Sequence, residues 1–252
     1  MAARGIRMDR AYFYSIMNGE GTLDYELYLN TKALLSCQKD FKDFCNQDEL
    51  QFQIVHQVEE MWMKLMGCTL LDIDDYLQQE NTNRVMTLFR RVHLAQRLMI
   101  EQLSLLETMS PKEYQEIRLR LGNGSGQESP GFRTLLRMHP LLWKSFQAHY
   151  LDKHNLTVEK IYNQEYSHSD AYLVAEALAE FDELFQRFRF AHMQLIQRTI
   201  GLGAKSLKGR SVELLNEGLR TRFFPELWDV RNRMTDQWGA HYGAVRDSIG
   251  GH

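Results

Sequence analysis

The chain has 252 residues, of which 44% are hydrophobic and 25% are charged, a composition typical of a globular protein with a substantial core. Thirty Lys and Arg residues against 33 Asp and Glu residues give a formal net charge of -3. This charge provides no basic surface for nucleic acid or for an anionic membrane. It favours a small molecule or another protein as the partner.

Three cysteines, an odd number, show neither CxxC nor CxxCH spacing. This pattern argues against a disulfide framework, a structural zinc site and a covalently attached c-type haem. The N-terminal residues lack the apolar segment of a secretion signal, and the chain contains no run of about 18 apolar residues. We therefore expect a cytoplasmic protein with no membrane-spanning segment.

Only four prolines interrupt the chain, which favours an all-α fold. Residues 1–22 are polar, contain glycines and carry three consecutive aromatic residues, so they predict an arm that becomes ordered against another surface. Residues 23–252 predict a single helical domain. Apolar residues at steps of three and four predict a long helix from Asp48 toward Tyr76 and a second helix over residues 82–107, packed as an antiparallel hairpin.

The next helix is predicted to begin at Ser110-Pro111 and to end at residues 121–122, because serine, proline and Glu113 have the spacing of a capped helix start. Small and turn-forming residues predict a loop over residues 123–131. Residues 132–168 indicate a helix interrupted near His139-Pro140 and then a polar stretch. Another long helix follows Ser169-Asp170 and continues to Gly201.

A basic, glycine-bearing loop is predicted over residues 201–211, followed by a short helix over residues 212–219 and a last helix that Pro225 can open. No segment shows the alternation of a β-strand. The two loops, residues 122–131 and 201–211, are the first places to look for function.

Two histidines occupy suggestive positions. His56 follows Phe52 by four residues, so both side chains share one face of a helix with Glu59, Glu60 and Met63. His192 lies in an apolar helical stripe, where a neutral imidazole needs a partner for each ring nitrogen. A metal or a haem iron would satisfy one nitrogen, and ordinary side chains or water would serve equally well.

Arg118 follows Tyr114 by four residues, so the guanidinium and the phenol face the same way. A guanidinium binds a carboxylate through two parallel hydrogen bonds, as an amino-acid substrate would require. A surface ion pair with Glu113 or Glu116 is the alternative.

Five stretches in order together resemble the tryptophan 2,3-dioxygenase family of haem oxygenases. They are Leu23-Asp24-Tyr25-Glu26-Leu27-Tyr28-Leu29 with Leu34-Leu35-Ser36-Cys37-Gln38; Asp48-Glu49-Leu50-x-Phe52-x-x-x-His56-Gln57 with Glu60-x-Trp62-x-Lys64; Glu113-Tyr114-x-x-x-Arg118-x-x-Leu121-Gly122-x-x-Ser125-Gly126; Phe188-Arg189-Phe190-x-His192-Met193 with Ile200-Gly201; and Arg222-Phe223-Phe224-Pro225-Glu226-Leu227-Trp228-x-x-Arg231. The resemblance spans residues 23–231 and implies an all-α, helical haem-binding domain.

The resemblance implies a role for each matching residue. His192 matches the proximal ligand of the iron in a haem b. Phe52 and His56 match distal residues near the indole ring, with His56 catalytic. The matching substrate-binding positions are Tyr114, Arg118, Leu121, Ser125 and Ser206, together with Tyr25, Tyr28 and Leu29 from the N-terminal segment of a neighbouring subunit in a homotetramer.

The chain departs from the family near the substrate. The glycine-rich Gly-Thr-Gly-Gly-Ser loop of the family is here Lys205-Ser206-Leu207-Lys208-Gly209, which is bulkier and less flexible. The arginine that usually precedes the proximal histidine is Ala191. The usual Ser-Gly-Phe-Gln-Ser is Ser125-Gly126-Gln127-Glu128-Ser129, which loses an aromatic side chain.

The resemblance thus implies an oxidoreductase that inserts oxygen from O2 at C2–C3 of the indole of L-tryptophan or a substituted tryptophan, giving a product of the N-formylkynurenine type. The changed loop keeps an alternative open, a monooxygenase that gives a hydroxylated or 2-oxindole product in secondary metabolism. A haem-binding sensor without turnover and a helical scaffold without haem are two further alternatives. The remaining histidines are interpreted as structural or exposed: His93, His139, His149, His154, His168, His241 and His252.

Overall fold

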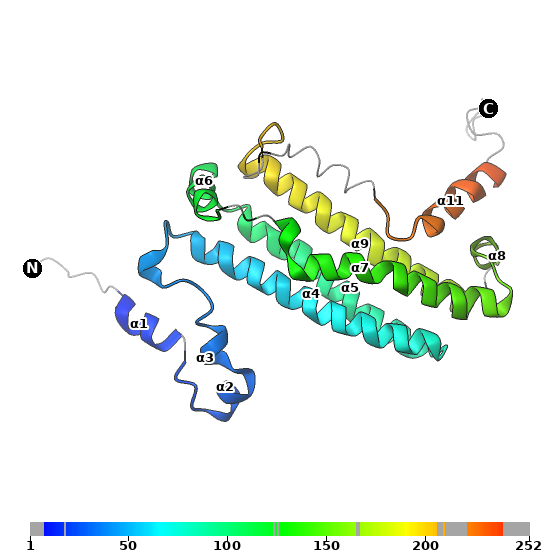
Figure 1. Ribbon diagram of the computed structural model, residues 1–252, viewed down its shortest axis with the longest axis horizontal. Helices are drawn as coiled ribbons and strands as arrows, with labels where there is room; N and C mark the ends of the chain where they lie inside the picture. The colour runs from blue at the N-terminus through cyan, green and yellow to red at the C-terminus, as the bar shows by residue number, and fades with distance from the viewer. Residues whose placement is uncertain are drawn as a thin grey trace, which may run out of the picture. The chain divides into compact units, whose positions relative to one another are not determined.

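The structure, a computed structural model, describes residues 8–17, 19–122, 124, 126–164, 167–205, 209 and 221–238. Its regular elements are helices joined by turns and loops, which confirms the predicted all-α class (Figure 1). Within these residues, no helix combines the length and the apolar character that crossing a membrane requires. The chain divides into two compact units, residues up to Ile54 and residues from Val55 onward.

The first unit contains short helices: α1 (Arg10–Met17), α2 (Asp24–Leu29), α3 (Thr31–Leu34) and the 3-10 turn η1 (Phe41–Asp43). None of these elements contains a buried residue. The loop that follows them is held at Glu49, which is 3% exposed, pairs with Lys39 and accepts a hydrogen bond from the Cys45 amide at 2.7 Å. A buried, paired carboxylate therefore fixes the start of the first long helix.

Four long helices dominate the rest: α4 (Glu49–Gln78), α5 (Thr82–Leu106), α7 (Pro130–Phe146) and α9 (Asp170–Thr199). The shorter elements between and after them are α6 (Pro111–Arg120), η2 (Gly126–Glu128), the π-helical turn η3 (Gln147–Leu151), η4 (Asp152–His154), α8 (Val158–Tyr162) and α11 (Pro225–Trp238).

The predicted helix starts are confirmed where a cap was recognised. The Ser110 side chain accepts a hydrogen bond from the Glu113 amide at 3.3 Å, while the Glu113 carboxylate accepts from the Ser110 amide at 2.9 Å. Ser169 caps α9, and Pro225 is the first residue of α11. Local side-chain chemistry thus sets these boundaries.

The predicted interruption near His139-Pro140 is wrong, because α7 passes through Pro140 without ending. Pro140 lies on the exposed side of the helix, where water can solvate the carbonyl that loses its hydrogen bond. The helix instead changes to a π-helical turn after Phe146. The short helix predicted over residues 212–219 lies outside the described residues.

The direction of each long helix follows from its contacts. The Gln102 amide of α5 donates to the Val55 carbonyl of α4 at 3.4 Å, although the two helices are joined at their opposite ends, which confirms the antiparallel hairpin. Helix α9 runs parallel to α5, since the three contacts between them keep the same order along both chains. These contacts are Thr82 with Asp170 at 2.9 Å, His93 with Ala177 at 3.0 Å and Gln96 with Phe181 at 2.9 Å.

Helix α7 packs on α4, because a Cβ at Gly67 would lie within 4 Å of Thr134 and Met138. The start of α11 is held by the fully buried Asp182 of α9. Its carboxylate accepts hydrogen bonds from three groups: the amides of Phe223 and Phe224, at 2.9 Å and 3.3 Å, and the Trp228 indole, at 2.8 Å. Phe223 and Phe224 thereby join the core formed by the long helices.

Candidate functional site

His56 of α4 and His192 of α9 lie close enough to affect each other's charge, and both side chains are half-buried. Burial lowers the pKa of His192 to about 4, and repulsion from His56 contributes to the same shift. His192 is therefore a neutral imidazole at neutral pH. A neutral ring has one nitrogen lone pair that can bind a metal.

An aromatic side chain lies beside the His192 ring. The Phe188 ring lies 6.4 Å from the His192 ring at an interplanar angle of 15°, and Met193 and Leu195 on the same helix are buried. No hydrogen bond to the His192 ring is found within the described part of the chain. A neutral imidazole whose lone pair is not already used by the protein can bind a metal or a haem iron.

Tyr114 and Arg118 lie on α6, which packs against α9. Burial raises the pKa of Tyr114, while the nearby Arg118 charge acts in the opposite direction, so the phenol stays neutral beside the guanidinium. Arg118 donates a hydrogen bond to the carbonyl of Lys205, in the loop that follows α9. The structure thus joins the helix before the first candidate loop to the second candidate loop.

The other predicted site residues are placed as follows. Phe52 lies one turn before His56 on α4, within the first unit, and Leu121 follows the last residue of α6 and is 38% exposed. Tyr25, Tyr28 and Leu29 lie on α2, and their side chains are exposed. Ser125 and Ser206 lie outside the described residues.

Two neighbouring acids on α4 were predicted only as part of the face that carries His56. Glu59 is 8% exposed, and burial raises its pKa to about 7, with a smaller contribution from the charge of Glu60. The Glu60 carboxylate accepts hydrogen bonds from the Ser129 hydroxyl and from the Gly131 amide, the latter at 3.0 Å. The helical spacing placed both acids near His56, but it did not predict these partners.

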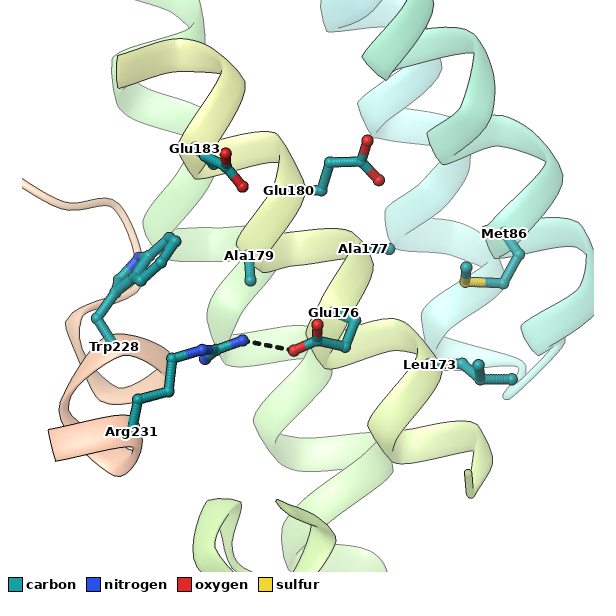
Figure 2. A pocket seen from close by; sticks show the side chains of 9 residues that line it. All are labelled: Met86, Leu173, Glu176, Ala177, Ala179, Glu180, Glu183, Trp228 and Arg231. Carbon is teal, nitrogen blue, oxygen red and sulfur yellow. Dashed lines mark hydrogen bonds and ion pairs between the residues drawn. The ribbon is translucent and has the colours of Figure 1, made fainter. Parts of the chain in front are cut away.

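A separate pocket of about 430 Å³ lies over α5, α9 and α11 (Figure 2). Its acids already have partners: Glu176 pairs with Arg231, Glu180 with Arg97, and Glu183 with Arg187. It contains none of the predicted site residues. It is therefore distinct from the candidate site.

Taken together, the fold and the site define an all-α protein with a neutral imidazole beside an aromatic ring and, on the adjoining helix α6, a guanidinium near a half-buried phenol. The residues present fit a b-type haem, since His192 offers an available nitrogen. Among the described residues, no cluster of three or more His, Cys, Asp or Glu side chains could hold a bare metal ion.

Comparison with known proteins agrees with this class. The family model for tryptophan 2,3-dioxygenase matches residues 15–139. The tryptophan 2,3-dioxygenase of Myxococcus xanthus is 32% identical over 264 aligned positions, covering 85% of this chain and 91% of the relative. The enzyme of the same name from Serratia proteamaculans is 29% identical, covering 84% of this chain and 93% of the relative.

The chain belongs to the tryptophan 2,3-dioxygenase family and is therefore an enzyme, an oxidoreductase. The family depends on haem in general.

Proposed function

We propose that this chain is a haem-dependent oxygenase that inserts oxygen from O2 at C2–C3 of the indole of L-tryptophan or a substituted tryptophan, giving a product of the N-formylkynurenine type. The observation that carries the proposal is His192, whose imidazole is neutral, lies beside the Phe188 ring and is close to His56. Haem would be held through His192 and would supply the iron centre at which dioxygen is activated.

Arg118 would bind the carboxylate of the substrate. Its guanidinium already donates to an oxygen acceptor, the Lys205 carbonyl, so it is oriented toward the loop that follows α9. A substrate carboxylate is a stronger acceptor than a peptide carbonyl and would compete for these donors. The neutral Tyr114 phenol would offer a further hydrogen bond nearby.

His56 would accept the proton of the indole N–H or hold it in a hydrogen bond, which requires a neutral ring. Phe52 and Leu121 would pack against the indole, and the hydroxyls of Ser125 and Ser206 would contact the polar end of the substrate. These roles rest on the positions that match the family motifs. Binding between an aromatic pocket and a guanidinium would orient the substrate and exclude water.

The N-terminal arm, residues 1–22, and the exposed α2 residues Tyr25, Tyr28 and Leu29 would complete the site of a neighbouring subunit in a cytoplasmic homotetramer. The exposure of these three side chains on one short helix supports this assignment, because neighbouring exposed apolar groups often mark an interaction surface. Removal of residues 1–22 should then raise KM for L-tryptophan. An unchanged KM would show that residues 1–22 do not contribute to substrate binding.

The Lys205-Ser206-Leu207-Lys208-Gly209 sequence favours a second candidate, a monooxygenase that gives a hydroxylated or 2-oxindole product. Lysine and leucine restrict the backbone where the family has glycine, so closure over the substrate would differ. A monooxygenase places one oxygen atom in the product and reduces the other to water, which requires two electrons from an external reductant. The dioxygenase reaction places both atoms in the product and requires none.

Turnover under 18O2 with product analysis by mass spectrometry separates the two reactions. The dioxygenase proposal predicts two labelled oxygen atoms in the product without added reductant. A product with one labelled atom, formed only when a reductant is added, would contradict it and support the monooxygenase. A change in the absorbance spectrum of the reduced haem protein on addition of L-tryptophan is also expected. Its absence would favour a haem sensor without turnover, and absence of haem binding would favour a helical scaffold.

A further inference from the structure

A side chain of α4 holds the end of the candidate loop, at residues 129–131. Glu60, four residues after His56, accepts hydrogen bonds from the hydroxyl of Ser129 and from the amide of Gly131 at 3.0 Å. Both donors lie where the loop enters α7. The attachment therefore joins the end of the loop to the turn of α4 that follows His56.

The same contact completes the N-terminus of α7. Ser129 is its N-cap and accepts a hydrogen bond from the Phe132 amide at 3.0 Å, while Pro130 has no amide hydrogen to satisfy. Glu60 satisfies the Gly131 amide with a negative charge, which the helix dipole favours. The carboxylate thus accepts hydrogen bonds from a hydroxyl and from an amide.

The close approach of α7 to α4 requires glycine at position 131. A Cβ built there would lie 2.6 Å from the Cβ of Met63 and 2.9 Å from a carboxylate oxygen of Glu60. Any larger residue would push the start of α7 away from α4. Carboxylate, hydroxyl and glycine therefore define a single position for the end of the loop.

We infer that Glu60 is a positioning residue, which fixes the end of the candidate loop, at residues 129–131, relative to His56 through Ser129 and Gly131. The inference rests on the proposed function, in which this loop contacts the substrate. Without the carboxylate, the loop would lose its anchor while α4, His56 and His192 remain in place. A displacement of about 1 Å at a substrate contact can lower catalytic efficiency about 100-fold.

The test compares Glu60→Ala with Glu60→Gln and with a matched control, Glu176→Ala. Glu176 also accepts from a hydroxyl, that of Tyr162 at 2.5 Å, and from a nitrogen donor, Arg231 at 2.6 Å, at the separate pocket (Figure 2). Hydrogen–deuterium exchange on the haem-loaded protein should be faster at residues 126–131 in Glu60→Ala. Glu60→Gln, which keeps an acceptor for Gly131, and the control should leave exchange there unchanged.

Steady-state kinetics with L-tryptophan then measures the consequence. Glu60→Ala should lower kcat/KM about 100-fold, chiefly through KM, with an unchanged haem spectrum, and Glu60→Gln should restore most of it. Unchanged exchange at residues 126–131 would overturn the anchor, and faster exchange with unchanged kcat/KM would overturn the positioning role. If the wild type shows no turnover but exchange responds as stated, the proposed function fails and the anchor itself is supported.

Discussion

His93 and His192 lie on the same pair of packed long helices, and their surroundings are opposite. His93 is 4% exposed, and each of its ring nitrogens faces a protein oxygen, the Ala177 carbonyl at 3.0 Å and the Glu180 carboxylate at 3.2 Å. His192 has apolar neighbours, and its ring makes no hydrogen bond within the described residues. Both rings are at least partly removed from water, but among the described residues only the His93 ring has hydrogen-bonding partners.

The difference separates a structural histidine from a candidate ligand. Removing an imidazole from water without giving it a protein partner costs free energy, which a bound group or water can offset. The first half of α9 follows the structural pattern, since Asp182 there accepts three hydrogen bonds. His192, in the second half of α9, departs from it.

The largest difference between the two histidines should appear when each is replaced by alanine in turn. His192→Ala should abolish stable haem binding, measured as the loss of the Soret band after reconstitution, because no other residue is proposed to bind the iron. His93→Ala should retain the Soret band but lower the free energy of unfolding by about 2 kcal/mol, because the Ala177 carbonyl and the Glu180 carboxylate lose their hydrogen-bond partner. A Soret band retained in His192→Ala and lost in His93→Ala would reverse the assignment.

Arg118→Ala tests whether the site beside His192 binds an amino acid. Loss of a charge-assisted pair with the substrate carboxylate should lower kcat/KM for L-tryptophan about 100-fold or more, mostly through KM. Arg120→Ala, on the same helix and exposed, is the control and should change kcat/KM less than about twofold. Equal effects of the two variants on kcat/KM would show that Arg118 does not bind the substrate carboxylate.

Asp182→Ala tests the structural half of α9. It would leave two amides and an indole N–H without their acceptor in the core, so the free energy of unfolding should fall by about 4 kcal/mol, measured by chemical denaturation. The haem spectrum of the folded variant should remain unchanged. A shifted spectrum with little loss of stability would show that the two halves of α9 are not distinct.

Glu59→Gln tests the buried acid beside His56. Its pKa is raised from 4.5 to about 7, so between these pH values the folded protein retains a proton that the unfolded chain has released, and stability falls as pH rises through this window. The full effect corresponds to about 3 kcal/mol above pH 7. Glu59→Gln should therefore match the wild type near pH 4.5 and be more stable at pH 8, whereas parallel urea midpoints across this range would contradict the raised pKa.

Much of the fold follows from local sequence signals. Ser110, Ser169 and Pro225 predicted helix starts because caps act within one turn, and apolar periodicity predicted the long helices and the hairpin of α4 and α5. The predicted interruption at Pro140 was wrong because the effect of a proline depends on which side of the helix faces water, and the sequence alone does not give that side.

The site was predictable in part for the same reason. Helical spacing paired Phe52 with His56 and Tyr114 with Arg118, since each pair lies on one helix. The proximity of His56 to His192 and the contacts of Glu60 with Ser129 and Gly131 join distant segments. Spacing along the chain carries no information about such contacts, so they required the structure.

The most direct measurement of the central claim is the resonance Raman spectrum of the reduced, haem-loaded protein. It should show an iron–histidine stretching band in the wild type and in His93→Ala. The band should be absent in His192→Gly and should return when imidazole is added, because imidazole can occupy the space left by the side chain. A histidine band that persists in His192→Gly without imidazole would show that another residue binds the iron.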